Sequence, residues 1–245
     1  MSSLLPPSAS SHAAQIDQVL ALVHWLMLVL FVGWGAYFGW VLLRFRSKRQ
    51  PAADHTGARG RLALGVEVGI VVAEVVLLVV FALPLWFSRT SARPTTADAI
   101  TIRIVAEQFV WNVHYPGEDG QFGETSPQFV SPTNPLGLDR KSAFGKDDVV
   151  EGSLIHLPVG RPVVIQLSSK DVIHSFGIPA MRVKQDAVPG LFTPVWFTPT
   201  EIGKFEIVCS QFCGGQGHYR MRGQIVVESE ADFRHFMLVE AAAQR

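Results

Sequence analysis

Residues 205–227 read FEIVCSQFCGGQGHYRMRGQIVV, and this segment indicates the fold of the region around it. Short β-branched and aromatic runs stand at its two ends, at Phe205–Val208 and Gln224–Val227, and a glycine-rich segment lies between them. Such runs favour strands, and glycines favour the loop that joins two strands. The segment therefore predicts two strands of a β domain that are connected by a long loop.

The loop carries a concentrated set of metal-binding side chains. It holds both cysteines of the chain, Cys209 and Cys213, and His218 and Met221 follow them closely. Thiolate, imidazole and thioether groups form the soft ligand set that selects copper. The residues alone leave other interpretations open, because the cysteines could form a disulfide in an oxidising compartment or could be inert buried thiols. A single Cys with two His and a Met would indicate one copper, whereas two Cys with a further His upstream suggest two coppers bridged by both sulfurs.

Further short runs extend the β pattern across the second half of the chain. Ile100–Val105 alternates in hydropathy, and Val163–Leu167 and Val195–Phe197 are β-branched or aromatic runs. Glycine and proline separate the runs, which is typical of a β-sandwich or a Greek-key barrel. Residues 116–152 hold many turn residues, so we expect a long insertion or loop there. We expect residues 231–245 to form a C-terminal helical tail.

Two apolar runs in the first part of the chain are long enough to cross a membrane. Val19–Leu43 contains no Lys, Arg, Asp or Glu, and Leu62–Phe87 carries two acids, Glu67 and Glu74. About 20 apolar residues span the hydrocarbon core as a helix, and buried helices of soluble proteins rarely stay this apolar for this long. No Lys or Arg precedes Val19, and the first run is longer than the apolar core of a signal peptide. We therefore expect a membrane anchor, with a cleaved leader as the alternative that the sequence leaves open.

Basic residues between the two runs indicate the orientation in the membrane. Six of them lie there: Arg44, Arg46, Lys48, Arg49, Arg59 and Arg61. The positive-inside rule puts this short loop in the cytoplasm and both chain ends on the outer side. We therefore expect a membrane anchor over residues 1–95, with helices near residues 19–45 and 62–88, and a translocated soluble domain over residues 96–230.

The composition narrows the class of protein. The 245 residues carry 21 Lys and Arg and 21 Asp and Glu, and this zero net charge argues against a nucleic-acid partner. Hydrophobic residues make up 48% of the chain and the mean hydropathy is +0.25, which excludes a disordered chain. Two cysteines are too few for a disulfide scaffold.

The segment around His174 carries a resemblance to a known family. Residues 171–179 read DVIHSFGIP, and residues 184–190 read KQDAVPG. Together with the cysteine loop and two preceding apolar helices, these motifs resemble subunit II of the haem–copper cytochrome c oxidases over nearly the whole chain. The resemblance implies a membrane-anchored α+β protein, in which a two-helix transmembrane hairpin precedes a cupredoxin-like Greek-key β-sandwich or barrel.

The resemblance also implies a dinuclear copper centre of the CuA type. Cys209 and Cys213 would be the bridging thiolates, and each histidine would bind one copper. Sharing two thiolates spreads one charge over both metals, so that little rearranges on reduction. The complete implied ligand set is His174, Cys209, Gln211 through its backbone carbonyl, Cys213, His218 and Met221.

Three positions depart from the family pattern. Four residues separate the second cysteine from His218 where the family usually has three, and the glycines between them can absorb the difference. Gln211 stands where the family commonly has a Glu that helps to hold Mg²⁺, so we expect that magnesium site to be absent or rebuilt. Phe109 replaces the Trp thought to receive the electron, and Trp111 would either take over that role or belong to the core.

Glu67 is a candidate for proton transfer. By its place early in the second apolar run, it matches the acid that the family uses at the mouth of a proton path into subunit I. An ionisable group in a membrane span is a functional hypothesis by default, although Glu67 could also mark the start of the helix at the membrane surface. Glu74 would share a helix face with it and has no family role.

The implied function is that of the electron-accepting subunit of a cytochrome-c oxidase in the bacterial inner membrane, with the soluble domain on the periplasmic side. It would take electrons from cytochrome c or a similar donor and pass them to haem in subunit I, where oxygen is reduced and protons are translocated. Subunit I, other oxidase subunits and the membrane would be its partners. Alternatives are a quinol oxidase subunit, although these typically lack the copper ligands, a nitric-oxide-reducing relative and a stand-alone copper carrier.

Overall fold

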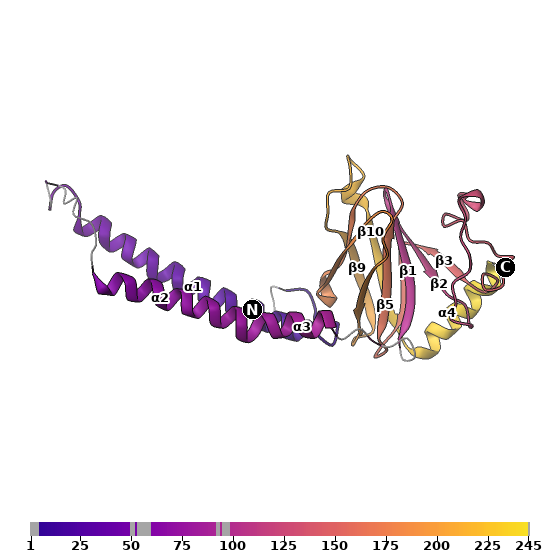
Figure 1. The fold of residues 1–245 in the computed structure, drawn as a ribbon, viewed down its shortest axis with the longest axis horizontal. Coiled ribbons are helices and arrows are strands. Elements are labelled where there is room, and N and C mark those ends of the chain that lie inside the picture. Colours follow the sequence, from indigo (N-terminus) through magenta and orange to yellow (C-terminus); the bar gives the residue numbers. More distant parts are fainter. Residues whose placement is uncertain (1–4, 50–51, 53–59, 92–93, 95–98, 245) are drawn as a thin grey trace. The chain divides into compact units, whose positions relative to one another are not determined.

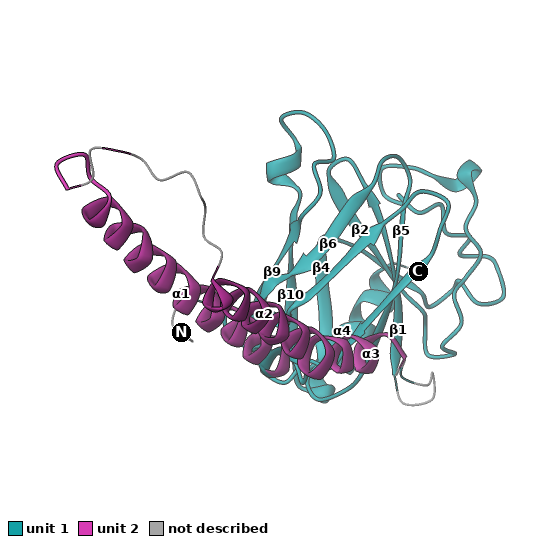
Figure 2. Ribbon diagram, turned by 60° about the vertical axis from the view of Figure 1, so that its left-hand side comes forward, with its two compact units in different colours: residues 1–14, 93–245 teal, residues 15–92 magenta. Residues whose placement is uncertain are grey.

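The computed structural model describes residues 5–49, 52, 60–91, 94 and 99–244. The chain divides into two compact units, one of residues 15–92 and one that combines residues 1–14 with residues 93–245 (Figure 2). The described residues before the first apolar helix thus group with the β domain, whereas we expected them in the anchor.

The unit of residues 15–92 is helical. Its first helix is α1 (Ala13–Arg44), and its second is continuous through α2 (Arg61–Val76), the π-helical turn η2 (Leu77–Ala82) and α3 (Leu83–Ser91). Both helices are long and apolar enough to cross a membrane, which confirms the two long apolar helices expected from the sequence. Arg59 of the basic loop lies outside the described residues.

The helices leave their large apolar side chains uncovered by protein. Phe31 of α1 is 77% exposed and Leu62 of α2 is 82% exposed, and similar side chains follow along both helices. Exposed apolar surface of this extent marks contact with a membrane or with another protein. The helices therefore have the surface that a lipid bilayer or partner helices would cover.

The other unit is a sandwich of two five-stranded sheets (Figure 1). The first sheet has the order β3 (Val149–Gly152), β2 (Val110–Tyr115), β1 (Ile100–Glu107), β5 (Val163–Ser169), β8 (Thr193–Phe197). The second has the order β4 (Leu154–Pro158), β10 (Arg222–Glu228), β9 (Gly203–Cys209), β6 (His174–Ile178), β7 (Val183–Ala187). Three short 3-10 turns complete the domain: η3 (Pro127–Phe129), η4 (Pro179–Met181) and η5 (His218–Arg220).

Alternating side chains build the core between the sheets. Ile102, Ile104 and Ala106 of β1 are fully buried, as the alternation of this run predicts. Trp111 of the first sheet meets Phe176 of the second with ring centroids 5.3 Å apart. The pairs β1–β5 and β4–β10 are parallel and the other pairs are antiparallel. The expected β-sandwich is therefore confirmed.

The region read as a loop contains one strand. β3 lies at the end of residues 116–152 and pairs with β2, so our expectation of a loop throughout was wrong there. Its four residues are too few to show an alternating pattern, and the strand depends on its neighbour for hydrogen bonds.

A buried carboxylate fastens the rest of this loop to the sheet. Asp148 is completely buried, and its Oδ2 accepts hydrogen bonds from His114 Nε2 at 2.6 Å and from the Gly123 N–H at 2.7 Å. Its Oδ1 accepts a third from the Gly117 N–H at 2.9 Å. One side chain therefore holds both ends of the segment 117–123 against β2.

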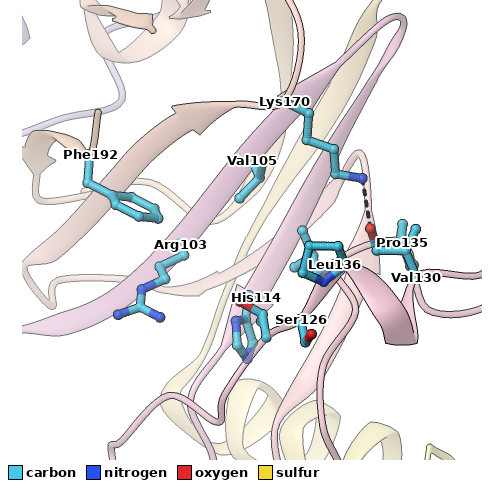
Figure 3. Close-up of a pocket in the computed structure, with 11 residues that line it drawn as sticks. Arg103, Val105, His114, Ser126, Val130, Pro135, Leu136, Lys170 and Phe192 are labelled. Atoms are coloured by element: carbon cyan, nitrogen blue, oxygen red, sulfur yellow. Dashed lines mark hydrogen bonds between the residues drawn. The ribbon is translucent and has the colours of Figure 1, made fainter. Parts of the chain in front are cut away.

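The fastened loop leaves a pocket of about 360 Å³ over the outer face of the first sheet (Figure 3). Arg103, His114 and Phe192 line it together with Lys170. The Lys170 ammonium is already engaged, because it donates to the Pro135 carbonyl at 2.7 Å and to the Glu107 carboxylate at 2.6 Å. The lining of the pocket is mainly apolar, and the Lys170 ammonium is already used to hold the loop in place.

The C-terminal segment forms helix α4 (Glu230–Ala243), which packs on the sandwich. Ser229 caps its first turn, because its Oγ accepts the Asp232 N–H at 3.1 Å. Phe233 is buried, and the Phe236 ring stacks on the His156 ring with centroids 4.0 Å apart. The tail is thus part of the β unit.

Residues before α1 also pack on the sandwich. The Ala9 N–H donates to the Ala180 carbonyl at 2.9 Å, and the Ala9 carbonyl accepts the Thr200 N–H at 2.9 Å. Ser10 Oγ donates to the Met181 carbonyl at 2.8 Å. Ala9 and Ser10 are both buried, so this short segment behaves as an added edge of the domain.

We expect Asp148→Ala to lower the free energy of unfolding of the β unit by about 3 kcal/mol, because it leaves several buried donors without an acceptor. Urea titration of the full chain in detergent, followed by tryptophan fluorescence, measures this change. Asp119→Ala is the matched control, since this exposed carboxylate of the same loop accepts one local hydrogen bond. Equal effects of the two substitutions would contradict the fastening role.

Candidate metal centre

Strand pairing brings the two halves of the candidate centre together. His174 is the first residue of β6, and Cys209 is the last residue of β9. These strands are antiparallel neighbours, with Phe176 opposite Cys209. The loop after Cys209 then turns back, so that Met221 precedes β10 on the other side of β9.

All six residues of the expected ligand set gather at this end of the second sheet. His174, Cys209 and Cys213 offer ligand atoms that all lie within 4.8 Å of one another. The two Sγ atoms are 3.8 Å apart, and Cys209 Sγ lies 3.2 Å from the Gln211 carbonyl oxygen. Cys213 Sγ lies 3.3 Å from His218 Nδ1 and 3.7 Å from Met221 Sδ.

The donor set fits a soft metal ion. His174 is completely buried, and its Nδ1 has no hydrogen-bond partner among the residues that the structure describes. A buried nitrogen without a partner is costly, and a metal ion would satisfy it. Both cysteines are free thiols, and at 3.8 Å their sulfurs can share an ion held at about 2.3 Å from each. The cluster therefore matches a metal site rather than a disulfide.

Hydrogen bonding determines which nitrogen of His174 faces the cluster. The Asp171 carboxylate lies 2.9 Å from His174 Nε2, which leaves Nδ1 for a metal ion. Partial burial opposes ionisation of Asp171, but hydrogen bonds from His174 and from the N–H groups of Gln108 and Val172 outweigh it and lower the pKa of this carboxyl. Asp171 is thus an anion that orients the imidazole, as outer carboxylates do at metal sites.

Burial and the neighbouring Cys209 thiol raise the pKa of Cys213 to about 11. Without a metal, this thiol is therefore protonated at neutral pH. Metal binding would displace the proton, because the thiolate is the ligand.

One residue that shapes the centre, Gln108, was not among the candidates expected from the sequence. Gln108 donates from Nε2 to the Cys213 carbonyl at 2.7 Å, and its N–H donates to Asp171 Oδ2 at 2.7 Å. Phe109 follows it and packs on the glycine spacer at Gly217. Phe109 and the lengthened spacer are two departures from the family pattern, and they are in contact with each other. The position of Gln108 beside Phe109 is a signal that the sequence offered, but its partners are distant in the chain.

The remaining candidate residues lie in different surroundings. Trp111 has no exposed surface, and its ring lies 6.1 Å from the His174 ring between centroids. Of the two roles we considered, the buried position matches the core, because a residue that contacts an external donor needs exposed surface. Phe109 is 37% exposed, and the Gln211 side chain is also exposed. Glu67 belongs to α2 in the helical unit and is not part of this cluster.

The loops that carry the candidate ligands also present apolar side chains to solvent. Ile173 precedes His174 and is 47% exposed, and Phe212 precedes Cys213 and is 70% exposed. The Phe212 ring also contacts the His218 ring, with centroids 5.5 Å apart. Exposed apolar surface beside a buried centre is suited to docking of another protein.

Comparison with known proteins identifies relatives over most of the chain. The model of the family described as cytochrome C oxidase subunit II, periplasmic domain, matches residues 100–230. The alternative cytochrome c oxidase subunit 2 of Bradyrhizobium diazoefficiens is 33% identical over 91% of this chain and 79% of its own length. Cytochrome c oxidase subunit 2 of Cereibacter sphaeroides is 31% identical over 92% of this chain and 76% of its own length. Among solved structures, the periplasmic domain of subunit II of cytochrome oxidase from Bradyrhizobium japonicum is 26% identical, covers 60% of this chain and 96% of its own, and has a TM-score of 0.44.

We expect Asp171→Ala to weaken copper binding by about 10–100-fold, because His174 loses the hydrogen bond that orients it. Competition with a chromophoric copper chelator measures the affinity of the full chain. Glu201→Ala serves as the control, since this carboxylate is exposed and lies outside the cluster. An unchanged affinity in Asp171→Ala would show that the imidazole needs no such partner.

Proposed function

Because the chain belongs to the cytochrome c oxidase subunit II family, we propose that it accepts electrons for a haem–copper oxidase at a dinuclear copper centre. Membership makes it a component of cytochrome c oxidase. The observation that carries the proposal is the convergence of His174, Cys209 and Cys213, with the buried His174 Nδ1 left free for a metal ion.

Each residue of the cluster has a role in this proposal. The thiolates of Cys209 and Cys213 and the imidazoles of His174 and His218 would hold the copper pair, with Met221 and the Gln211 carbonyl as weaker ligands. When bound, the copper pair supplies a one-electron redox centre. Burial of Cys213 and Met221 keeps water away from these two sulfur atoms.

The path of the electron begins at the exposed surface beside the cluster. We propose that cytochrome c or a similar donor docks on the apolar side chains there, with Phe109 as the aromatic residue that it first contacts. Trp111 lies behind His174 and would support the imidazole from the core. Haem in subunit I would receive the electron next and would reduce oxygen with proton translocation.

Two observations support the proposed topology. Ala9 and Ser10 bind the β domain directly, so the start of α1 and the β domain lie on the same side of any membrane that the helices cross. The basic loop between the helices favours the cytoplasm. We propose a multi-pass protein of the bacterial inner membrane with its β domain in the periplasm. The exposed Gln211 amide offers no carboxylate, so we propose no magnesium site through it.

We expect the oxidase complex purified through this chain to hold two coppers per chain at this centre. The electron paramagnetic resonance spectrum of this centre should show more copper hyperfine lines, more closely spaced, than one nucleus gives. His218→Ala should disturb this sharing more than Met221→Leu, because imidazole is the stronger ligand. A single copper with one-nucleus splitting would disprove the dinuclear centre, and absence of a haem-containing subunit would favour a copper carrier.

We expect Glu67→Gln to slow oxygen reduction by the complex while the copper centre is still reduced at the normal rate. The reason is the position of this acid one to two turns into α2, on the side where protons would be taken up. Stopped-flow reduction and steady-state oxygen consumption separate the two steps. Glu74→Gln is the matched control on the same helix, and equal turnover of the wild type and Glu67→Gln would leave Glu67 without a proton role.

A further inference from the structure

The spacer between Cys213 and His218 is packed against the turn that joins β1 and β2. A Cβ atom added to Gly217 would overlap ring carbons of Phe109, and one added to Gly214 would lie 2.5 Å from Gln108 Nε2. Both contacts are closer than side chains tolerate. The Gln108–Phe109 turn therefore packs against the backbone of these two glycines.

The two glycines differ in what their backbones demand. Gly214 has a φ of +127°, a conformation that favours glycine whatever surrounds it. Gly217 has φ −86° and ψ −25°, which any residue adopts without strain. The three atoms nearest to such an added Cβ all belong to the Phe109 ring, so a substitution at position 217 tests this contact.

Hydrogen bonds join the same turn to both loops of the cluster. The Gln108 side chain holds the Cys213 carbonyl, and its backbone N–H reaches the Asp171 carboxylate that orients His174. Gln108 is itself solvent-exposed, so water could satisfy its amide without these bonds. Its bonds connect His174, at the start of β6, with Cys213, in the loop after β9, through a turn of the first sheet.

We propose that Gln108 and Phe109 are positioning residues, which lock the glycine spacer and thereby set the distance from Cys213 to His218. The Phe109 ring lies against the backbone at Gly217, and the Gln108 amide holds the Cys213 carbonyl just before the spacer. This inference rests on the proposed copper function, but the lock is a property of the protein without metal. It can therefore be tested separately.

The metal-free test measures how fast iodoacetamide alkylates Cys213 in the full chain, with the modified site located by mass spectrometry. Cys213 is 3% exposed, so it reacts only when the loop opens. We expect Gly217→Ala to raise the rate by about tenfold, because the added methyl collides with Phe109. In a Phe109→Ala background the same change should raise the rate less than twofold, since the collision is gone.

Gln108→Leu tests the hydrogen bond in the same assay. Loss of the amide donor should raise the alkylation rate of Cys213 by about fivefold. Phe144→Ala is the control. It removes a similarly exposed phenylalanine outside the Gln108–Phe109 turn, and it should leave the alkylation rate of Cys213 unchanged. If Gly217→Ala does not fold, the result for Gln108→Leu still decides the proposal.

The copper-loaded protein provides a second readout that a merely structural contact would not change. Gly217→Ala should alter the copper hyperfine pattern, and Phe109→Ala combined with Gly217→Ala should restore it toward the pattern of Phe109→Ala. An equal effect of Gly217→Ala with and without the Phe109 ring would overturn the lock, as would an unchanged alkylation rate in Gln108→Leu. A wild-type chain that binds no copper pair would instead refute the proposed function, with the metal-free result still deciding the lock.

Discussion

The pairing of β6 with β9 is the constraint on which the candidate centre depends. It sets Phe176 opposite Cys209 and so brings His174, at the start of β6, to the cysteines at and after the end of β9. Both strands lie in the interior of their sheet, where each is hydrogen-bonded on two sides. A slip of one residue would turn His174 to the other face of the sheet. The register of this pair therefore fixes the distance between the imidazole and the thiols.

Asp171 connects the paired strands to the candidate metal ligands. Its carboxylate faces His174 on one side and the Gln108 N–H on the other, and the resulting ionised state keeps the imidazole Nδ1 directed at the sulfurs. The first sheet contributes through Gln108, which also holds the Cys213 carbonyl. The centre is thus supported from both layers of the sandwich, although its implied ligands come from the second layer and the loops beside it.

Phe109 and the longer glycine spacer, the two departures from the family pattern near this turn, contact each other. The glycines of the spacer allow the Phe109 ring to lie against the backbone at Gly217, which no residue with a side chain would permit without movement. The Phe109 ring and the longer spacer pack against each other, so the size of each limits which residues can stand at the other. The same ring is partly exposed, which makes the supporting contact also part of the surface open to a donor.

The sequence by itself determined the two apolar helices, several strands and the set of candidate soft ligands, because each depends on a local pattern of residues. It did not reveal strand β3, the buried Asp148 that fastens its loop, or the packing of Ala9 on the β domain. Trp111 was left between an electron-entry role and the core, and the sequence could not show that its ring is fully buried and lies against His174 and Phe176. These features depend on contacts between residues far apart in the chain, and such contacts exist only once the two sheets have packed together.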